Sequence, residues 1–316
     1  MVYRFTRCIA IALAGLCLAR PVIAADYPSR PITFFTMVQP GAQIDRLARG
    51  LAERFAGELG QPVNVRNITG GSHGSVMATE LGKAGNDGYT LAIAATTAYT
   101  YQPHHAPVQY SLDDFEFLSL VALNSSGFVS APDKPWDTLS GAFEWARENG
   151  KALVCMFHGS DDRDVIQRIA KSEDVNISLI PSKGGPSIIQ AVTGGHADIG
   201  YLGAILYEHV RAGRLKLIAS ALNERLSPIP DVPTLKEQGY DESVEMFITL
   251  VGPAGIPDDV VARLDTVVNK LAGDDATEQF ITEQLLMRPV KWGREHAHSY
   301  VQSTYELFGK QAKASD

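Results

Sequence analysis

The sequence predicts two α/β lobes, and two observations carry that prediction. The chain has 316 residues, which is more than one ordinary domain needs and suits two lobes of roughly 100–150 residues each. Short apolar runs also alternate with longer amphipathic segments, and this alternation restarts midway along the chain. The apolar fraction of 45% and the charged fraction of 20% are typical of a globular protein.

The first half of the chain has the alternation of a parallel sheet with crossover helices. Leu47, Leu51 and Phe55 recur at helical spacing, which predicts a helix over 45–59 that Gly60 ends. We expect strands at 32–37, 63–65 and 90–94. A second helix is expected at 75–83.

The second half repeats this pattern. We expect strands at 153–157, 177–180, 198–201 and 217–221, and helices at 164–172, 186–193 and 204–212. Two further helices, at 258–272 and 294–312, have no strand after them. We therefore expect these last two helices to pack back on the first lobe.

The N-terminus has the features of a secretory signal. Arg4 and Arg7 precede an apolar run over 8–19, and small residues follow at Ala24 and Ala25, where we expect cleavage. The run of about 12 residues is shorter than the roughly 20 that a membrane-spanning helix needs, which disfavours a membrane anchor. The sequence thus predicts a signal peptide at 1–25 and a periplasmic mature protein.

Charge and cysteine content narrow the class of partner. The formal net charge of −8 argues against nucleic acid, which attracts basic surfaces. Cys8 and Cys17 lie in the predicted signal, so Cys155 is left without an intramolecular partner. Its neighbours are apolar, which favours a buried strand residue over a nucleophile.

Glycine and small polar residues cluster where the predicted strands end. In open α/β sheets these ends form the ligand site, glycines let backbone N–H groups approach a ligand, and helix N-termini favour anions. One set of such loops in each predicted lobe suits the clamping of a carboxylate. The loops lie at 39–43, 69–74, 95–97, 158–160 and 182–187.

Motifs over most of the mature chain carry a family resemblance. They are Tyr27-Pro28-Ser29-Arg30-Pro31-Ile32, Gly41, Asp45, Ala48-Arg49, Gly60-Gln61-Pro62-Val63, Asn67, Asp87-Gly88-Tyr89-Thr90-Leu91, Arg211-Ala212-Gly213-Arg214-Leu215, Asp231-Val232-Pro233-Thr234, Glu237-Gln238-Gly239, Gly252-Pro253-Ala254-Gly255-Ile256-Pro257 and Arg263-Leu264. Their order and spacing resemble those of the substrate receptors of the tripartite tricarboxylate transporters, also called Bug proteins.

The resemblance implies a type II periplasmic-binding-protein fold, in which two α/β lobes joined by crossing strands close over a ligand cleft. It implies the capture of a small carboxylate for a membrane permease, without a cofactor. We expect a first lobe at 26–127, a second lobe at 128–247, and a return to the first lobe with C-terminal helices at 248–316. In this family the acid at the position of Asp45 helps to order the first loop.

The chain departs from the family pattern at the loops. Met37-Val38 stands where the family usually has Pro-Phe, so an aromatic wall is missing. Arg163 replaces a histidine, and Tyr201-Leu202-Gly203 lacks the acid that follows this strand in many members. That loss argues against an amino-acid ligand unless Asp161 or Asp162 takes its place. Acids at a helix N-terminus are more often partners of the helix dipole.

Catalytic and metal-binding alternatives have little support. The segment 70–74 does not fit a dinucleotide or phosphate loop, and Ser72 beside His73 has no orienting acid. For each of these two residues, a role as a hydrogen-bond donor to the ligand and a position on the loop surface are about equally favoured. His104-His105 lacks metal-ligand spacing. We predict no enzyme activity, no metal and no cofactor.

The sequence therefore predicts an exported, monomeric solute-binding protein that takes a small carboxylate for permease subunits. Two alternatives stay open, a sensor that signals to a membrane partner and, less favoured, a secreted hydrolase or isomerase. The expected ligand-binding residues are Val38, Gln39, Gly41, Gln43, Asp45, Gly71, Ser72, Thr96, Thr97, His158, Gly159, Ser160, Arg163, Lys183, Gly184, Ser187 and Tyr201.

Overall fold

Five strands form the sheet of the first lobe, in the order β2-β1-β3-β10-β4. The computed structural model describes residues 27–315; the predicted signal peptide at 1–25 lies outside them. β1, β2 and β3 are parallel, as the alternation predicts, whereas β10 runs antiparallel to β3 and β4. These strands are β1 Ile32–Thr36, β2 Val63–Asn67, β3 Thr90–Ala95, β4 Phe115–Leu123 and β10 Phe247–Pro253.

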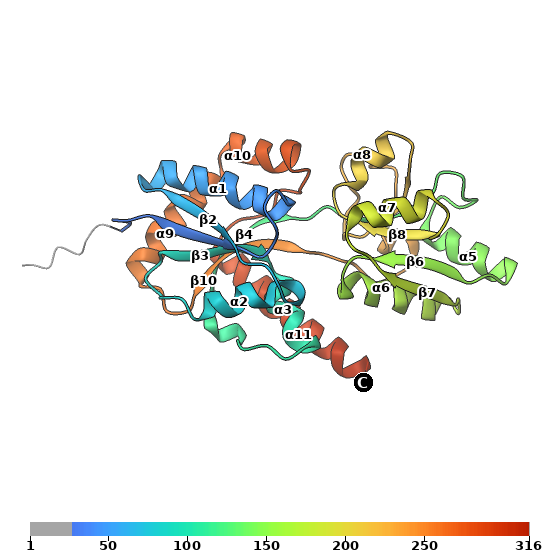
Figure 1. The fold of residues 1–316 in the computed structure, drawn as a ribbon, viewed down its shortest axis with the longest axis horizontal. Coiled ribbons are helices and arrows are strands. Elements are labelled where there is room, and N and C mark those ends of the chain that lie inside the picture. The colour runs from blue at the N-terminus through green and yellow to red at the C-terminus, as the bar shows by residue number, and fades with distance from the viewer. Residues whose placement is uncertain (1–26, 316) are drawn as a thin grey trace, which may run out of the picture.

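Helices cover both faces of this sheet (Figure 1). The apolar stripe of α1 packs with α9 on one face, while α2, α3 and α11 share a core on the other. Gly60 ends α1 in the left-handed conformation, with φ 68°. The helices are α1 Gln43–Leu59, α2 Ser75–Gly82, α3 Thr97–Thr100, α4 Gln102–His105, α9 Asp258–Ala272, α10 Asp275–Gln279 and α11 Arg294–Ser315.

The second lobe is a similar three-layer unit with strand order β7-β6-β8-β5-β9. β6 is parallel to β7 and β8, and β5 is antiparallel to β8 and β9. Its strands are β5 Gly127–Ser130, β6 Leu153–Phe157, β7 Ile177–Pro181, β8 Ile199–Leu202 and β9 Lys216–Ser220. Its helices are α5 Leu139–Asn149, α6 Ser160–Ser172, α7 Gly185–Thr193 and α8 Leu206–Arg211.

Two short segments cross between the lobes. Asn124, Ser125 and Ser126 connect β4 to β5, and Glu245 and Met246 lead into β10. The two segments are paired, because the Asn124 N–H donates to the Met246 carbonyl at 3.0 Å. Figure 1 shows these segments, in green and orange, running between the lobes. The lobe boundaries at 127/128 and 247/248 remain a proposal.

Two predictions about the fold need correction. Both sheets are mixed, because the unpredicted strands β4, β5 and β10 add antiparallel pairs. Helix α6 begins at Ser160, four residues before the predicted start at 164, and Gly159 occupies its N-cap position. The early start follows from Asp162, whose carboxylate accepts the N–H groups of His158 and Gly159 and so stabilises the first turn.

Candidate ligand site between the lobes

Asp45 holds the loop after β1 in place. Its carboxylate is 1% exposed and accepts the Gly41 N–H at 2.8 Å and the Arg49 guanidinium at 2.9 and 3.0 Å. Burial alone would raise the pKa of Asp45. The hydrogen bonds from Arg49, Gly41 and Asn67 outweigh burial and hold this pKa below its ordinary value. Asp45 thus shapes the edge of the site.

The second loop, at 70–74, depends on its glycines. Gly71 has φ 67°, and a Cβ there would lie 2.1 Å from Ser75 Oγ. Gly74 has φ 79°, and a Cβ there would lie 2.8 Å from Met37 Cβ. Between them His73 takes φ 49°, a region that side chains other than glycine rarely adopt. The loop therefore presents the side chains of Ser72 and His73 in one fixed arrangement.

Two threonine hydroxyls, one at the end of β1 and one at the start of α3, are buried without a hydrogen-bond partner in the described chain. Thr36 is 0% and Thr97 is 2% exposed, and neither Oγ1 has a hydrogen-bond partner among residues 27–315. The hydroxyl of Thr96, by contrast, donates to the Phe247 carbonyl at 3.2 Å. Buried polar groups are nearly always hydrogen-bonded. These two hydroxyls are therefore suited to meet a polar ligand.

In the second lobe, the two acids at the start of α6 behave differently. Asp162 turns back to accept the N–H groups of His158 at 2.8 Å and Gly159 at 2.6 Å. Asp161 instead points to the first lobe, with Oδ1 3.7 Å from His73 Nε2. Burial and the nearby charge of Asp161 raise the pKa of Asp162. Asp161 thus faces the imidazole of His73 across the lobes.

The remaining residues of the second lobe that were predicted to bind ligand lie in four settings. Ser187 Oγ accepts the Lys183 N–H and donates to the Gly184 carbonyl, so this loop is held by its own contacts. Tyr201 is 7% exposed and packs edge-on against Phe128 in the lobe core. His158 is exposed. Arg163 turns sideways, and its guanidinium contacts Asp164.

Three predicted residues in and after the first loop fall into two groups. Val38 accepts from Asn67 through its carbonyl, and Gln39 donates weakly to Thr69 at 3.4 Å. Both contacts join the first loop to the end of β2 and the residues that follow it. Gln43 instead donates to the Leu285 carbonyl at 2.6 Å, so its side chain ties α1 to the C-terminal region.

The structure brings the glycine-rich loops of the two lobes together. His73 Nε2 also lies 3.6 Å from the position of a Cβ on Gly159, so the loops at 70–74 and 158–160 face each other directly. Sequence reasoning did not find Tyr101, whose hydroxyl donates to Asp164 of α6 at 2.8 Å. It also did not find Thr36 and Asn124, whose buried side-chain oxygens lack partners in the described chain. No sequence motif marks these three residues.

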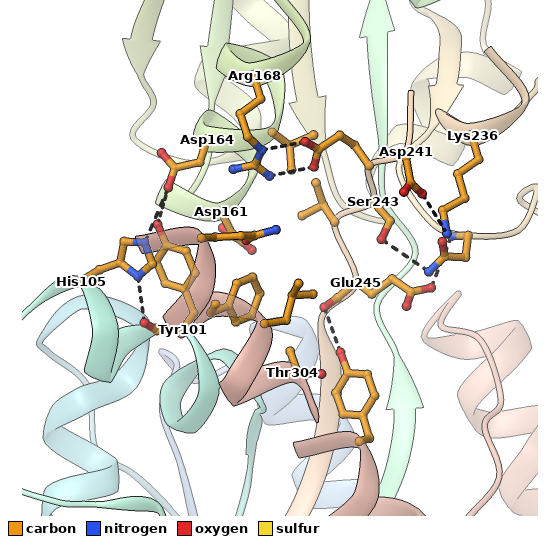
Figure 2. A pocket seen from close by; sticks show the side chains of 18 residues that line it. Tyr101, His105, Asp161, Asp164, Arg168, Lys236, Asp241, Ser243, Glu245 and Thr304 are labelled. Carbon is orange, nitrogen blue, oxygen red and sulfur yellow. Dashed lines mark hydrogen bonds and ion pairs between the residues drawn. The ribbon is translucent and has the colours of Figure 1, made fainter. Parts of the chain in front are cut away.

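A cavity of about 350 Å³ lies beside these loops, between α6, α11 and the segment that enters β10 (Figure 2). None of the predicted ligand-binding residues lines it. Its charged groups are largely paired with each other. Arg168 makes a bidentate contact with Glu242, and Lys236 lies 3.6 Å from Asp241. The cavity therefore offers few unpaired groups to an anion, and the facing loops are the better ligand site.

Residues 27–315 contain no group of three or more His, Cys, Asp or Glu side chains that could hold a metal ion. Across the same residues, no helix has the length and apolar character needed to cross a membrane. Cys155 is 0% exposed, and burial raises the pKa of its thiol, which fits the predicted core residue.

Two α/β lobes joined by short crossing segments, with glycine-rich loops facing each other, define the fold of a two-lobe binding protein. The family model described as "Tripartite tricarboxylate transporter family receptor" matches residues 47–311. The chain belongs to this family of solute receptors. The predicted fold and family are thereby confirmed.

Individual relatives agree with the family assignment. The chain is 31% identical over 286 residues to the protein BugT of Bordetella pertussis, covering 87% of this chain and 85% of BugT. MatC of Rhodopseudomonas palustris, solved with bound malate, has a TM-score of 0.73 at 22% identity, covering 90% of this chain and 100% of MatC. An R. palustris protein solved with adipate has a TM-score of 0.77 at 20% identity, covering 91% and 99%. At these identities the two structures show the fold alone.

Proposed function

We propose that this protein captures a small dicarboxylate between its lobes. The observation that carries the proposal is the meeting of the two glycine-rich loops, where His73 Nε2 lies 3.7 Å from Asp161 Oδ1 across the lobes. A ligand held by both loops would keep the lobes together. The proteins of similar fold that were solved with malate and with adipate suggest the class of ligand.

Backbone N–H groups and neutral hydroxyls would carry the recognition. The hydroxyls of Thr36 and Thr97 are buried and without partners in the described chain, and each could donate to a carboxylate oxygen. Hydrogen bonds to a charged group contribute more than those between neutral groups. The proposed ligand-binding residues of both lobes remain those given by the sequence, with Thr36 added.

The acids at the start of α6 do not call for an amino group on the ligand. Asp162 is already used by two backbone N–H groups, and Asp161 faces His73. An ammonium group would have to displace His73 to reach Asp161. A ligand that carries carboxylates and no amine therefore fits better than an amino acid.

We infer further that the mature protein works in the periplasm as a monomer and delivers its ligand to permease subunits. The predicted signal peptide supports export, and family membership supports the partnership. The family consists of receptors rather than enzymes. We expect the bound compound to be recovered unchanged.

The test is a binding screen on the mature protein. Thermal shift with malate, adipate, an aromatic acid and an amino acid would identify the class, and isothermal titration calorimetry would give the affinity. We expect a dicarboxylate to raise the melting temperature and to show the same NMR spectrum before and after incubation. Stabilisation by amines alone would refute the dicarboxylate proposal, and consumption of the compound would refute simple capture.

A further inference from the structure

Helix α6 of the second lobe contacts three side chains of the first lobe. Ligand binding alone does not explain these contacts. We propose that His73, Tyr101 and His105 of the first lobe and Asp161 and Asp164 of the second form a closing contact. This contact positions the lobes around the ligand, and it strengthens as the histidines gain protons. The proposal rests on the proposed function, because it describes how that site closes.

Tyr101 is the centre of the closing contact. Its hydroxyl donates to Asp164 Oδ2 at 2.8 Å, and its ring stacks on His105 with centroids 3.7 Å apart and an interplanar angle of 8°. The ring of His73 lies on another side of it, at 5.0 Å between centroids. Figure 2 shows the stacked pair of Tyr101 and His105 reaching towards Asp164. Three aromatic rings from the first lobe thus pack as one unit against α6.

The contacts of His105 place an oxygen that accepts hydrogen bonds near each ring nitrogen. Nδ1 lies 2.9 Å from the Tyr101 carbonyl oxygen, which can only accept, so Nδ1 carries a hydrogen. Nε2 lies 3.8 Å from Asp164 Oδ2, which as a carboxylate oxygen also favours a hydrogen on its partner. Both contacts are therefore favourable together only in the charged imidazolium. A neutral ring would leave the lone pair of Nε2 facing a carboxylate.

His73 makes the second cross-lobe pair. Nδ1 lies 2.9 Å from Ser72 Oγ, a hydroxyl that can donate or accept, and Nε2 lies 3.7 Å from Asp161 Oδ1. The neutral ring can satisfy both neighbours with its hydrogen on Nε2, and protonation adds a charge attraction to Asp161. Because His73 belongs to the glycine-rich loop, this pair links the loop that meets the ligand to the closure of the lobes.

Several titratable and charged groups surround the two histidines. His73 faces Asp161 of α6 and the phenol of Tyr101 of the first lobe. His105 faces Asp164, whose other oxygen already accepts from Arg163.

Other ionisable groups belong to the surroundings of His105. Arg168 of α6 lines the same cavity. His104 precedes His105 on α4, and Lys313 of α11 acts on His104. The carboxylates that pair directly with His73 and His105 are those of Asp161 and Asp164.

A contact that forms only in the closed arrangement raises ligand affinity without touching the ligand. If the ligand binds the closed form, its apparent affinity scales with the fraction of protein that is closed. Partly exposed ion pairs contribute modestly. Two of them together should change affinity by about three- to tenfold.

The first experiment measures dicarboxylate affinity by calorimetry at about pH 6 and about pH 8, on either side of the ordinary histidine pKa. In the wild type, affinity should be about three- to tenfold higher at the lower pH. The double variant His73→Gln/His105→Gln should lose most of this ratio. Protonation of the dicarboxylate itself changes the affinity ratio of all variants by the same factor. Comparing the ratios of two variants therefore removes this contribution. Asp161→Asn/Asp164→Asn should flatten the ratio in the same way.

Two further variants separate closure from folding. Tyr101→Phe removes a hydrogen bond whose donor does not titrate in this range, so it should weaken binding equally at both pH values. His196→Gln changes an exposed histidine of the second lobe and should leave the pH ratio at the wild-type value. Melting temperatures of all variants would show that each one folds.

The second experiment needs no ligand, and so it separates this proposal from the dicarboxylate proposal. Spin labels at the exposed positions Glu80→Cys and Lys151→Cys, one in each lobe, report the distance between lobes by pulsed electron resonance. The distance distribution should move towards shorter values from pH 8 to pH 6 and should stay fixed in the double histidine variant. An unchanged distribution in the wild type, or an unchanged pH ratio in the folded histidine variants, would overturn the closing contact.

Discussion

The side-chain amide of Asn67 donates to Asp45 Oδ1 at 2.7 Å and to the Val38 carbonyl at 2.9 Å. A residue at the end of β2 therefore fixes both the start of α1 and the loop after β1. Arg49 joins the same group through Nη2, which lies 3.1 Å from Asn67 Oδ1. Because this network holds the first loop, it should control ligand binding by fixing the shape of that loop.

Asp45→Asn should destabilise the protein by about 1–3 kcal/mol, because the Arg49 pair and the Gly41 hydrogen bond lose their charged acceptor. It should also weaken ligand binding. Urea unfolding and calorimetry would measure the two effects. The control is Asp87→Asn, which breaks the Arg30 pair between side chains that are 58% and 53% exposed and should cost well under 1 kcal/mol. Equal losses for the two variants would contradict a special role of Asp45.

The pKa of Asp45 gives this network a pH dependence. Its folded-state pKa is lower than its ordinary value, so its contribution to stability is present above the unfolded pKa of about 3.9. That contribution is lost as the pH falls through the folded pKa. The stability gap between wild type and Asp45→Asn should therefore narrow in acid. A gap of constant size from neutral pH to about pH 3 would show that Asp45 acts through packing alone.

Asp162 should show the opposite dependence. Burial and the charge of Asp161 raise its pKa in the folded protein, so the folded state holds a proton that the unfolded state has released. Its contribution to stability is therefore full below the unfolded pKa of about 3.9 and falls as pH rises through the folded pKa. Carbon-13 NMR of the Asp162 carboxyl should show a raised midpoint. Asp161→Asn should lower that midpoint. An unchanged Asp162 midpoint in this variant would exclude charge coupling between the two acids.

The fold was predictable where each segment carries its own pattern. The apolar stripe of α1 and the glycine after it fixed that helix within two residues, and β6 and α9 match their predicted bounds. β4 and β10 were not predicted, because nearly every residue on them is buried. A continuous apolar run has no period that separates strand from helix.

The same limit applies to the site. Glycine loops could be found from sequence, because a positive φ favours glycine locally. The pairs between His73 and Asp161 and between Tyr101 and Asp164 join residues of different lobes. Such contacts depend on how two folded units meet, and no local spacing encodes that. Likewise, the missing partner of Thr97 becomes visible only when every neighbouring group has been placed.

Thr97→Val should separate ligand binding from stability. The Thr97 hydroxyl has no partner among residues 27–315, so the isosteric change should leave stability unchanged or slightly higher. Affinity for the dicarboxylate should fall about tenfold if the hydroxyl donates to it. Thr249→Val is the matched control, since the buried Thr249 hydroxyl donates to the Ser119 carbonyl at 2.8 Å. That control should lose about 1–2 kcal/mol of stability and retain binding. Unaltered affinity in Thr97→Val would remove Thr97 from the site.

Gly71→Ala should distort the loop at 70–74, which is proposed to meet the ligand. The new Cβ would lie 2.1 Å from Ser75 Oγ, and alanine would also have to adopt φ 67° at a cost of about 1–2 kcal/mol. Gly60→Ala imposes the same strain at φ 68° with nothing within 4 Å of the new Cβ. Both variants should therefore lose stability, and only Gly71→Ala should lose most of its dicarboxylate binding. Similar binding losses in both would mean that strain, and not loop shape, causes them.

Cys155 offers a labelling measure of the same binding event. It is the one cysteine that remains after the predicted signal. It is fully buried on β6, and burial raises the pKa of its thiol, so the native protein should react with a thiol reagent only through unfolding. A ligand at 100 times its dissociation constant should slow that reaction by about 100-fold, because it stabilises only the folded state. Unfolding in urea should restore fast labelling, as a check that the thiol is free. Two results would contradict this expectation: rapid labelling of the native protein, or a labelling rate that is the same with and without saturating ligand. Either result would show that β6 opens locally while the ligand site stays closed.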